Sequence, residues 1–555
     1  MTPRRRLAGL GAFALASALV LSACGGGGNA GDDAPEAEGP STGVVSFANG
    51  EPQNPLIPTH TNEVYGSAVV TNLFSGLVYY DAEGVPQNEV AESIESDDKQ
   101  NWTITLQDGW TFSDDTPVTA QSFVDAWNYG AYGKNAQNLS YFFEPIEGFA
   151  DVQVPTDENG EPTGEPKAET MSGLKVVSDT EFTVTLSQPE SDFPLRLGYS
   201  AFYPLPESFF EDPEKGGQEP VGNGPYQLES WEHESLITLT PREGYEGPRE
   251  PQNGGLELVV YTAEDASYND LLDGNVDLVR EVASSALGTF EDELGERAIN
   301  QPAAQNQTLA VPEWLPEFQG EAGLLRRQAI AAAIDRAQIT ETIFSGSRTP
   351  ATDFTSPVIE GWTENLPGSE VLEYDAERAK QLWTEAEAAD PVGADYTLQI
   401  ASNADANHQP WIDAVCNNIR TVLEIGCEFY PYPTFDEFLD ARDNGQVPGL
   451  FRAGWLADYP AASNFLGPVF GTDAGSNDVQ YSSKEFDDLM RQGNGAASTE
   501  EALEFYNQAQ GVLFADLPAI PLWYENSTGG FAETVDNVQF GWDGEPILYA
   551  VTKQG

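Results

Sequence analysis

The chain has 555 residues, of which 90 are Asp or Glu and 25 are Lys or Arg, and its formal net charge is −65. With 40% apolar residues, a chain of this length can bury a sizeable core, so we expect a folded protein. Binding to nucleic acid or to anionic bilayers depends on clustered Lys and Arg, which this charge opposes. We therefore expect no nucleic-acid partner and interpret the carboxylates as a hydrated acidic surface.

The first 23 residues have the organisation of a secretory signal sequence. Three arginines, Arg4 to Arg6, precede an apolar stretch from Leu7 to Leu21, and the small residues Ser22 and Ala23 follow it. Cys24 comes next, and the run Leu21-Ser22-Ala23-Cys24 resembles the lipobox of exported bacterial lipoproteins. We expect residues 1–23 to be removed and Cys24 to become a lipidated first residue, which leaves a mature net charge of −68.

The segment that follows the lipobox is predicted to be a flexible linker over residues 24–43. It consists mostly of Gly, Ala, Pro and acidic residues, which bury little apolar surface, and the folded body is expected to begin near Val44. No later stretch approaches the roughly 20 apolar residues that a membrane-spanning helix needs. The lipid is therefore expected to be the only membrane anchor, on the outer face of the cell membrane and outside the cytoplasm.

The body has the periodicities of a mixed α/β protein. Alternating apolar and polar residues predict strands over 102–106, 182–186 and 236–239. Helices are predicted from a cap at Thr119, over 325–344, from a cap at Asp375, and from a capping box formed by Ser498 and Glu501. Between the first two predicted strands, the Pro- and Gly-rich stretch 151–167 is expected to be a surface excursion.

Two cysteines remain in the mature body, Cys416 and Cys427, which are 11 positions apart. In an oxidising compartment such a pair predicts a disulfide. The spacing fits a helix from Trp411 to about Leu423 whose early turn is tied to a strand after Gly426. Two alternatives stay open: a pair of buried free thiols, or a metal-binding pair, for which no third ligand lies nearby in the sequence.

Motifs of common enzymes are missing from the predicted body. Its three histidines are scattered, and it contains no GxSxG, HExxH, P-loop or GxGxxG pattern and no Cys/His cluster. Carboxylate pairs are uninformative in a chain with 90 acidic residues. These observations favour binding without turnover, so we expect a protein that is not an enzyme and that uses neither a cofactor nor a metal ion.

Several longer segments follow one another along residues 44–555. They are Leu73–Val78 (LFSGLV), Trp110–Ala120 (WTFSDDTPVTA), Asn223–Tyr226 (NGPY), Asp273–Asp277 (DGNVD), Arg327–Arg336 (RQAIAAAIDR), Arg452–Tyr459 (RAGWLADY) and Pro518–Leu522 (PAIPL). In this order they resemble the family 5 solute-binding proteins of ABC importers, which take up oligopeptides, dipeptides and nickel. The resemblance covers nearly the whole body and is therefore more specific than any single motif.

The resemblance implies an α/β, two-lobed fold like that of periplasmic binding proteins, of type II and cluster C, with an additional domain on the first lobe. Lobe 1 would combine residues 44–80, 175–305 and 523–555, the additional domain would be 81–174, and lobe 2 would be 306–522. A cleft between the lobes would hold the ligand and close over it.

For the ligand site, the resemblance implies that Asp458 holds the amine of a bound peptide through a charge-assisted hydrogen bond. The backbone around Gly454 and a strand containing Val64 would pair with the peptide main chain. Trp455 and Tyr141 are expected to be pocket walls.

By the same resemblance, Arg452, Arg442 and His408 are expected at the far end of the peptide, as partners for its carboxylate. Two departures from the family pattern bear on this. Pro448 and Gly449 interrupt what should be a strand between the two arginines, and Leu456 stands where some relatives have a bridging cysteine.

The resemblance therefore predicts a monomeric lipoprotein that captures short peptides, releases them unchanged, and delivers them to the permease and ATPase subunits of an ABC importer. One alternative keeps the fold but exchanges the ligand for a metal chelate, an opine or an oligosaccharide. Two others are a secreted hydrolase, which would need a nucleophile beside a base, and a surface adhesion or signalling module, which would lack a closed cleft.

Overall fold

The computed structural model describes residues 41–156, 162–393, 395–404 and 407–555. The predicted signal sequence, the lipidation site Cys24 and most of the predicted linker lie outside the described residues, as does the centre of the predicted excursion at 151–167. The described part is a mixed α/β protein, as the sequence predicts.

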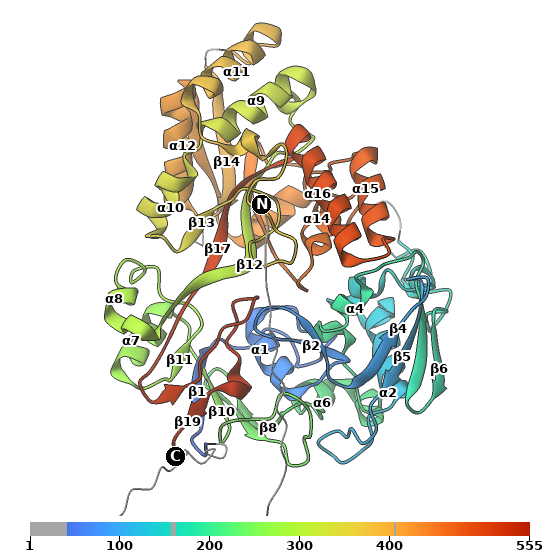
Figure 1. Ribbon diagram of the computed structural model, residues 1–555. Coiled ribbons are helices and arrows are strands. Elements are labelled where there is room, and N and C mark those ends of the chain that lie inside the picture. Colours follow the sequence, from blue (N-terminus) through green and yellow to red (C-terminus); the bar gives the residue numbers. More distant parts are fainter. Residues whose placement is uncertain (1–40, 157–161, 394, 405–406) are drawn as a thin grey trace, which may run out of the picture. The chain divides into compact units, whose positions relative to one another are not determined.

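Within the described residues, eleven strands form one mixed sheet in the order β15-β14-β16-β12-β17-β11-β1-β10-β9-β8, with β13 also paired to β17 (Figure 1). Their bounds, in the order of the sheet, are β15 Gly426–Tyr432, β14 Thr397–Asn403, β16 Leu450–Leu456, β12 Ala298–Ala310, β17 Ala519–Phe531, β11 Leu278–Val279, β1 Val45–Asn49, β10 Leu256–Val260, β9 Leu236–Pro241 and β8 Tyr226–Glu232, followed by β13 Arg348–Pro350.

The long strands β12 and β17 connect the two largest of the three hydrophobic cores in the described residues. Each strand has 13 residues, and their antiparallel pairing shifts register between Pro302 and Asn306. Before the shift the pair runs toward a core built on β1, β8, β9 and β10, and after it toward a core built on β14, β15 and β16. The shift lies where the predicted lobe boundary falls, at 305/306, and the division into lobes itself remains a prediction.

The second core is enclosed by helices on both faces of β14, β16, β12 and β17. Figure 1 shows α9 to α12 on one face and α14 to α16 on the other. The bounds are α9 Gly320–Ala333, α10 Arg336–Phe344, α11 Ala376–Ala389, α12 Gln409–Leu423, α13 Phe435–Asp443, α14 Ala462–Phe470, α15 Lys484–Asn494 and α16 Thr499–Asp516.

The first core continues into a smaller four-stranded sheet of order β4-β5-β7-β6. Its strands are β4 Ala91–Glu95, β5 Asn101–Leu106, β7 Glu181–Thr185 and β6 Leu174–Ser178, so this sheet extends past residue 174, the predicted end of the additional domain. The helices on this side are α1 Val64–Leu73, α2 Ala120–Ala131, α3 Phe149–Val152, α4 Phe193–Arg196, α5 Glu207–Glu211, α6 Pro213–Gln218, α7 Glu264–Asp273 and α8 Phe290–Leu294. Two-stranded pairs are β2 Val78–Tyr80 with β3 Pro86–Asn88, and β18 Val535–Asp536 with β19 Thr552–Lys553.

Most local predictions are confirmed. The predicted strands correspond to β5, β7 and β9, and the side chains of Thr119, Asp375 and Ser498 cap α2, α11 and α16. In a capping box, the Glu501 carboxylate would also accept the backbone N–H of Ser498. In α16 it accepts the N–H of Ala497 instead, one residue earlier.

The single helix predicted over 325–344 is wrong. The chain leaves the helical conformation at Ile334 and Asp335 and forms α9 and α10 instead. The Asp335 carboxylate accepts the N–H of Gln338, and the Asp335 N–H donates to the Asn418 side chain. These bonds compensate for the helical hydrogen bonds that are lost at the break.

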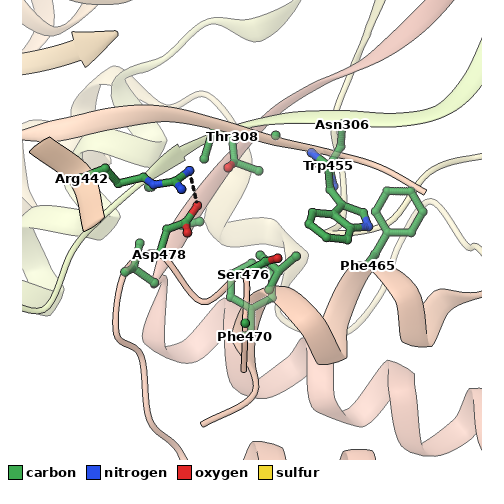
Figure 2. A pocket seen from close by; sticks show the side chains of 15 residues that line it. Asn306, Thr308, Arg442, Trp455, Phe465, Phe470, Ser476 and Asp478 are labelled. Atoms are coloured by element: carbon green, nitrogen blue, oxygen red, sulfur yellow. Dashed lines mark hydrogen bonds and ion pairs between the residues drawn. The ribbon is translucent and has the colours of Figure 1, made fainter. Parts of the chain in front are cut away.

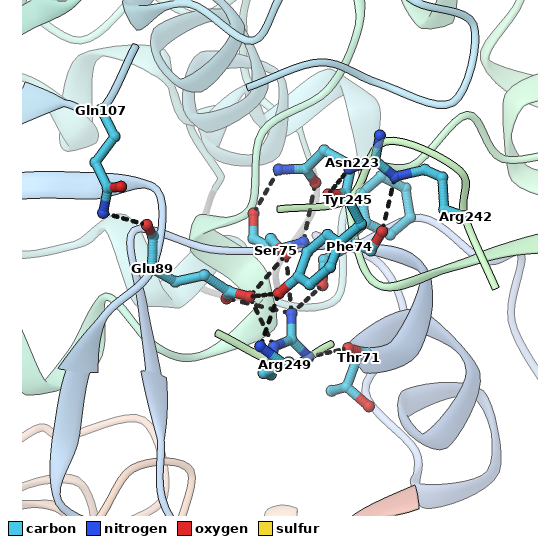
Figure 3. A network of polar contacts seen from close by, with 10 residues as sticks. Thr71, Phe74, Ser75, Glu89, Gln107, Asn223, Arg242, Tyr245 and Arg249 are labelled. Carbon is cyan, nitrogen blue, oxygen red and sulfur yellow. Dashed lines mark hydrogen bonds and ion pairs between the residues drawn. The ribbon is translucent and has the colours of Figure 1, made fainter. Parts of the chain in front are cut away.

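A buried ion pair between Glu89 and Arg249 joins three segments of the first core (Figure 3). The Arg249 Nε lies 2.7 Å from Glu89 Oε1, and its other nitrogens donate to the carbonyls of Thr71 and Phe74. The Tyr245 hydroxyl donates to the same carboxylate at 2.9 Å. The guanidinium is thus satisfied by one charge and by the carbonyls at the end of α1, which fixes the position of α1.

The predicted disulfide is present. Cys416 in α12 and Cys427 in β15 are bonded, with their Cα atoms 5.1 Å apart. Both residues are buried in the second core, so the bridge fixes α12 against the sheet at its β15 edge.

Candidate ligand-binding site

Strand β16 has an edge that is open along part of its length. It pairs with β12 over residues 451–456, whereas β14 pairs only with Leu450 and Phe451. The N–H groups of Trp455 and Ala457 donate toward β12. Because backbone groups alternate along a strand, those of Arg452 and Gly454 point to the other side, where the described residues form no ladder. This edge can accept a further strand.

Asp458 follows this edge and is held by Asn464 at the start of α14. The Asn464 Oδ1 accepts the N–H of Asp458 at 3.0 Å, and its Nδ2 donates to Asp458 Oδ2 at 3.1 Å. The same Oδ1 accepts from Trp455 Nε1 at 2.9 Å. One amide side chain therefore fixes both the carboxylate and the indole ring.

The charge of Asp458 acts on three tyrosines: Tyr80 at the end of β2, Tyr141, and Tyr199. Burial raises the pKa of each phenol, and the charge of Asp458 raises it further. Burial also raises the pKa of Asp458 itself to about 6, against the opposing effects of the Asn464 hydrogen bond and the charge of Arg196. Among the described residues, the Asp458 carboxylate forms no ion pair within 4 Å, and Arg196 is the cation whose charge acts on it.

The nearby cation, Arg196, is engaged elsewhere. Its guanidinium lies 3.2 Å from the Glu190 carboxylate and 5.3 Å from the ring centre of Tyr459. The same segment of the first core contacts the second core directly, since Asp192 accepts a hydrogen bond from the Ser463 hydroxyl and the Ser191 N–H donates to the Asn494 carbonyl at 2.7 Å. Asp458 therefore lies close to where the two cores meet.

A small cavity of about 220 Å³ opens beside Gly454 and Trp455, between the sheet and α14 (Figure 2). Asn306 and Thr308 of β12 line it on the sheet side, and Phe465 and Phe470 of α14 line it on the helix side. Its end is formed by Arg442 of α13 and Asp478, which are ion-paired at 2.8 Å. Burial raises the pKa of Asp478 to about 6, although the charge of Arg442 opposes the shift.

The two candidate arginines differ in their surroundings. Arg442 is ion-paired with both Asp478 and Asp443. Arg452 makes no ion pair within 4 Å among the described residues, and its Nε is buried without a hydrogen-bond partner there. Burial lowers the pKa of Arg452, and the nearby Glu525 partly offsets this effect. Strand alternation places the Arg452 side chain on the face of β16 opposite to Ala453 and Trp455, and the charge of Arg442 is close enough to lower the pKa of Arg452 further.

The remaining predicted residues are distributed around this region. Tyr141, with 51% of its surface exposed, lies close to Asp458. His408 precedes α12, and its Nδ1 accepts from Trp411 Nε1 at 3.3 Å. Pro448 and Gly449 directly precede β16 and do not break it.

The strand predicted to contain Val64 is wrong. Val64 is the first residue of helix α1, whose N–H groups are capped by the Glu63 carboxylate. Val64 is 39% exposed, but a helical backbone has no free edge to pair with an extended peptide.

Sequence reasoning missed Asn464, Tyr80 and Tyr199. Asn464 lies six residues after Asp458, in the first turn of the apolar helix α14, and this proximity along the chain is the available signal. Tyr80 and Tyr199 come from distant segments, and nothing in their local sequence indicates that they approach Asp458.

Comparison with known proteins identifies the family of the chain. The family model of bacterial extracellular solute-binding proteins, family 5, matches residues 85–477. The chain belongs to this family. No metal-binding cluster of three or more His, Cys, Asp or Glu side chains occurs in the described part of this family 5 protein, and no helix there is long and apolar enough to cross a membrane.

Relatives of this family 5 protein match along most of their length. The oligopeptide-binding protein OppA of Bacillus subtilis is 25% identical over 541 residues, covering 95% of this chain and 96% of the relative. The probable deoxycholate-binding periplasmic protein YgiS of Escherichia coli is 27% identical over 498 residues, covering 87% and 88%. The unliganded open form of the periplasmic murein tripeptide-binding protein MppA has a TM-score of 0.75 at 21% identity, covering 92% and 97%. The last match shows the fold, which is the two-lobed type II fold of solute-binding proteins.

Proposed function

We propose that this family 5 protein binds short peptides that carry a free amino terminus. The observation that carries the proposal is the open edge of β16 at Arg452 and Gly454, which leads to a desolvated carboxylate at Asp458. A peptide backbone could add to this edge as a strand, and its amine would then reach Asp458.

The surroundings of Asp458 suit an ammonium group better than an anion. An ammonium has three donors, while an ionised carboxylate accepts several hydrogen bonds, of which Asn464 supplies one through its side chain. A cation gains energy where it meets the face of an aromatic ring, and the charge of Asp458 reaches Tyr80, Tyr141 and Tyr199. Because Asp458 is desolvated without a close counter-ion, an ammonium ligand would remove an existing cost.

Arg452 is the candidate partner for the peptide carboxylate. A buried guanidinium with an unsatisfied nitrogen gains a charge-assisted hydrogen bond when a carboxylate arrives. Arg442 is a weaker candidate because Asp478 and Asp443 already neutralise it. His408 remains a prediction for longer peptides.

A second candidate function is the binding of a non-peptide solute on the same fold. It is supported by one relative, the probable deoxycholate-binding periplasmic protein YgiS of Escherichia coli. Deoxycholate carries a carboxylate and no amine, so it would place negative charge against Asp458 if it occupied the same position. The peptide proposal is therefore preferred.

The proposed cellular role is delivery of the captured peptide to the permease and ATPase subunits of an ABC importer by a monomeric lipoprotein. The sequence supports export and lipidation at Cys24. Replacing Cys24 by Ser should release the protein from the membrane fraction into the medium, as measured by immunoblotting of cell fractions. Retention of the variant in the membrane would contradict the lipid anchor.

The binding proposal is tested with the mature chain and with mixtures of di- to pentapeptides. Peptides with a free amine should raise the melting temperature, N-acetylated peptides should bind at least about tenfold more weakly, and Asp458→Asn should abolish this difference. Mass spectrometry of the incubated peptides should show them intact, which separates binding from hydrolysis. Equal affinity for free and acetylated peptides would overturn the role of Asp458.

A further inference from the structure

The cavity beside Gly454 is too small for a whole ligand but large enough for one amino-acid side chain. Its volume is about 220 Å³, below the range of roughly 300–1,000 Å³ that is usual for complete small-molecule sites. Gly454 belongs both to the cavity lining and to the open edge of β16. A side chain of a peptide paired to that edge could therefore enter it, since side chains of an added strand project from its faces.

The cavity changes in character from one end to the other. Figure 2 shows the rings of Trp455 and Phe465 at one end and the ion pair of Arg442 and Asp478 at the other. The aromatic end and the side wall at Phe470 favour an apolar or aromatic side-chain body. At the charged end, Arg442 Nη1 and Asp478 Oδ2 lie 2.8 Å apart, so the two side chains neutralise each other's charge.

A charged side chain of the ligand would disturb the charge neutralisation between Arg442 and Asp478. A Lys or Arg side chain would bring a second cation to Arg442, and an Asp or Glu side chain would bring a second anion to Asp478. Either must break a partly buried ion pair, which is costly when one partner is left unpaired. A neutral side chain with a hydroxyl can instead donate to Asp478 or accept from Arg442 without separating them.

We propose that this cavity is a specificity subsite for one side chain of the bound peptide, that it selects an aromatic side chain with an uncharged polar end, such as tyrosine, and that the Arg442–Asp478 pair excludes charged side chains. The inference rests on the proposed peptide binding. It gives Arg442 a role different from the expected contact with the peptide carboxylate.

The test uses the full mature protein and tripeptides of Ala with one variable position, measured by titration calorimetry. At one position, Tyr should bind best, Phe and Leu somewhat more weakly, and Glu and Lys at least about tenfold more weakly than Tyr. Failure of every peptide to bind would refute the proposed function itself. Binding of the peptides with no preference at any position would refute the subsite alone.

Two variants make the test reciprocal. Asp478→Asn leaves Arg442 with less compensation at the end of the cavity and should shift the preference toward Glu, whereas Arg442→Gln leaves Asp478 without its cation and should shift it toward Lys. Tri-alanine, which places only a methyl group in the cavity, should bind both variants within about threefold of wild type if the fold is intact. Opposite shifts support the subsite. Equal losses for all peptides, including tri-alanine, would contradict it.

Discussion

Asn464 holds Asp458 through two hydrogen bonds, accepting its backbone N–H at 3.0 Å and donating to its carboxylate at 3.1 Å. The same amide oxygen accepts from Trp455, so one side chain orients the proposed amine receptor and a wall of the adjacent cavity. The position of Asp458 thus depends on a residue from the following helix.

Replacing Asn464 by Ala should therefore impair both stability and binding. The substitution leaves the indole N–H and the Asp458 N–H without their acceptor, which costs about 1–3 kcal/mol of unfolding free energy if no water replaces it. Peptide affinity should fall about tenfold because the carboxylate loses its orientation. Urea denaturation and calorimetry measure the two effects. Asn444→Ala, at an exposed position after α13, is the matched control and should change neither by a comparable amount.

Peptide affinity should depend on pH through Asp458. Its pKa is about 6 in the free protein, and an ammonium ligand would lower it, so binding near pH 6 should release protons. Affinity should rise as the pH increases toward 6, level off above that value, and fall by up to about tenfold per unit below it.

Other charged groups near Asp458 must be separated from this effect. The charge of Arg196 acts on Asp458, and burial raises the pKa of Glu190, the ion-pair partner of Arg196, to about 7. Calorimetry of wild type and Asp458→Asn, in two buffers of different ionisation enthalpy, isolates the proton release that is due to Asp458. If the variant retains the pH dependence of the wild type, the titrating group is another one.

Adding a methyl group at Gly454 should disturb the pairing of β16 with β12. A Cβ atom there would lie 2.6 Å from the Asn306 carbonyl oxygen, which is backbone and cannot rotate away. Gly454→Ala should lower the unfolding free energy by about 1–3 kcal/mol and weaken peptide binding. Gly511→Ala in α16 is the control, because nothing lies within 4 Å of its added Cβ, and it should be neutral or stabilising. Equal melting temperatures for both variants would disagree with the stated geometry.

Removing the charge of Glu89 should destabilise the first core. The side chains of Glu89 and Arg249 are only 1% and 8% exposed, so Glu89→Gln leaves a buried guanidinium without its counter-charge. The expected loss is about 3–5 kcal/mol, measured by chemical denaturation. Glu92→Gln, at an exposed position in β4, should change stability by less than about 0.5 kcal/mol. A comparable loss in the two variants would mean that the buried pair contributes no more than a surface charge.

The disulfide between Cys416 and Cys427 should contribute measurably to the second core. The bond closes a short loop, and its removal by the double Ser substitution should cost about 2–4 kcal/mol. Alkylation followed by mass spectrometry should label two additional thiols only after reduction. Two labelled thiols in the native, unreduced protein would refute the bond.

The sequence was sufficient for features that depend on neighbouring residues. Alternation identified β5, β7 and β9, and the capping side chains of Thr119 and Asp375 marked the starts of α2 and α11. It failed at Asp335, where a capping side chain inside an apolar run divided one predicted helix into two. The resemblance also failed at Val64, where the Glu63 carboxylate caps the start of a helix in place of the implied strand.

The amino-acid sequence by itself determined the α/β class, the order of the matching segments and the position of Asp458 in the segment RAGWLADY, since these depend on local patterns and on an ordered series of motifs. Tertiary structure alone decided which side chains surround that carboxylate. Tyr80, Tyr141 and Tyr199 come from segments up to 119 positions apart and reach Asp458 only because the two cores meet there. It also decided that, among the described residues, Arg442 forms ion pairs and Arg452 forms none, because ion pairing depends on distances between atoms, which spacing along the chain does not specify.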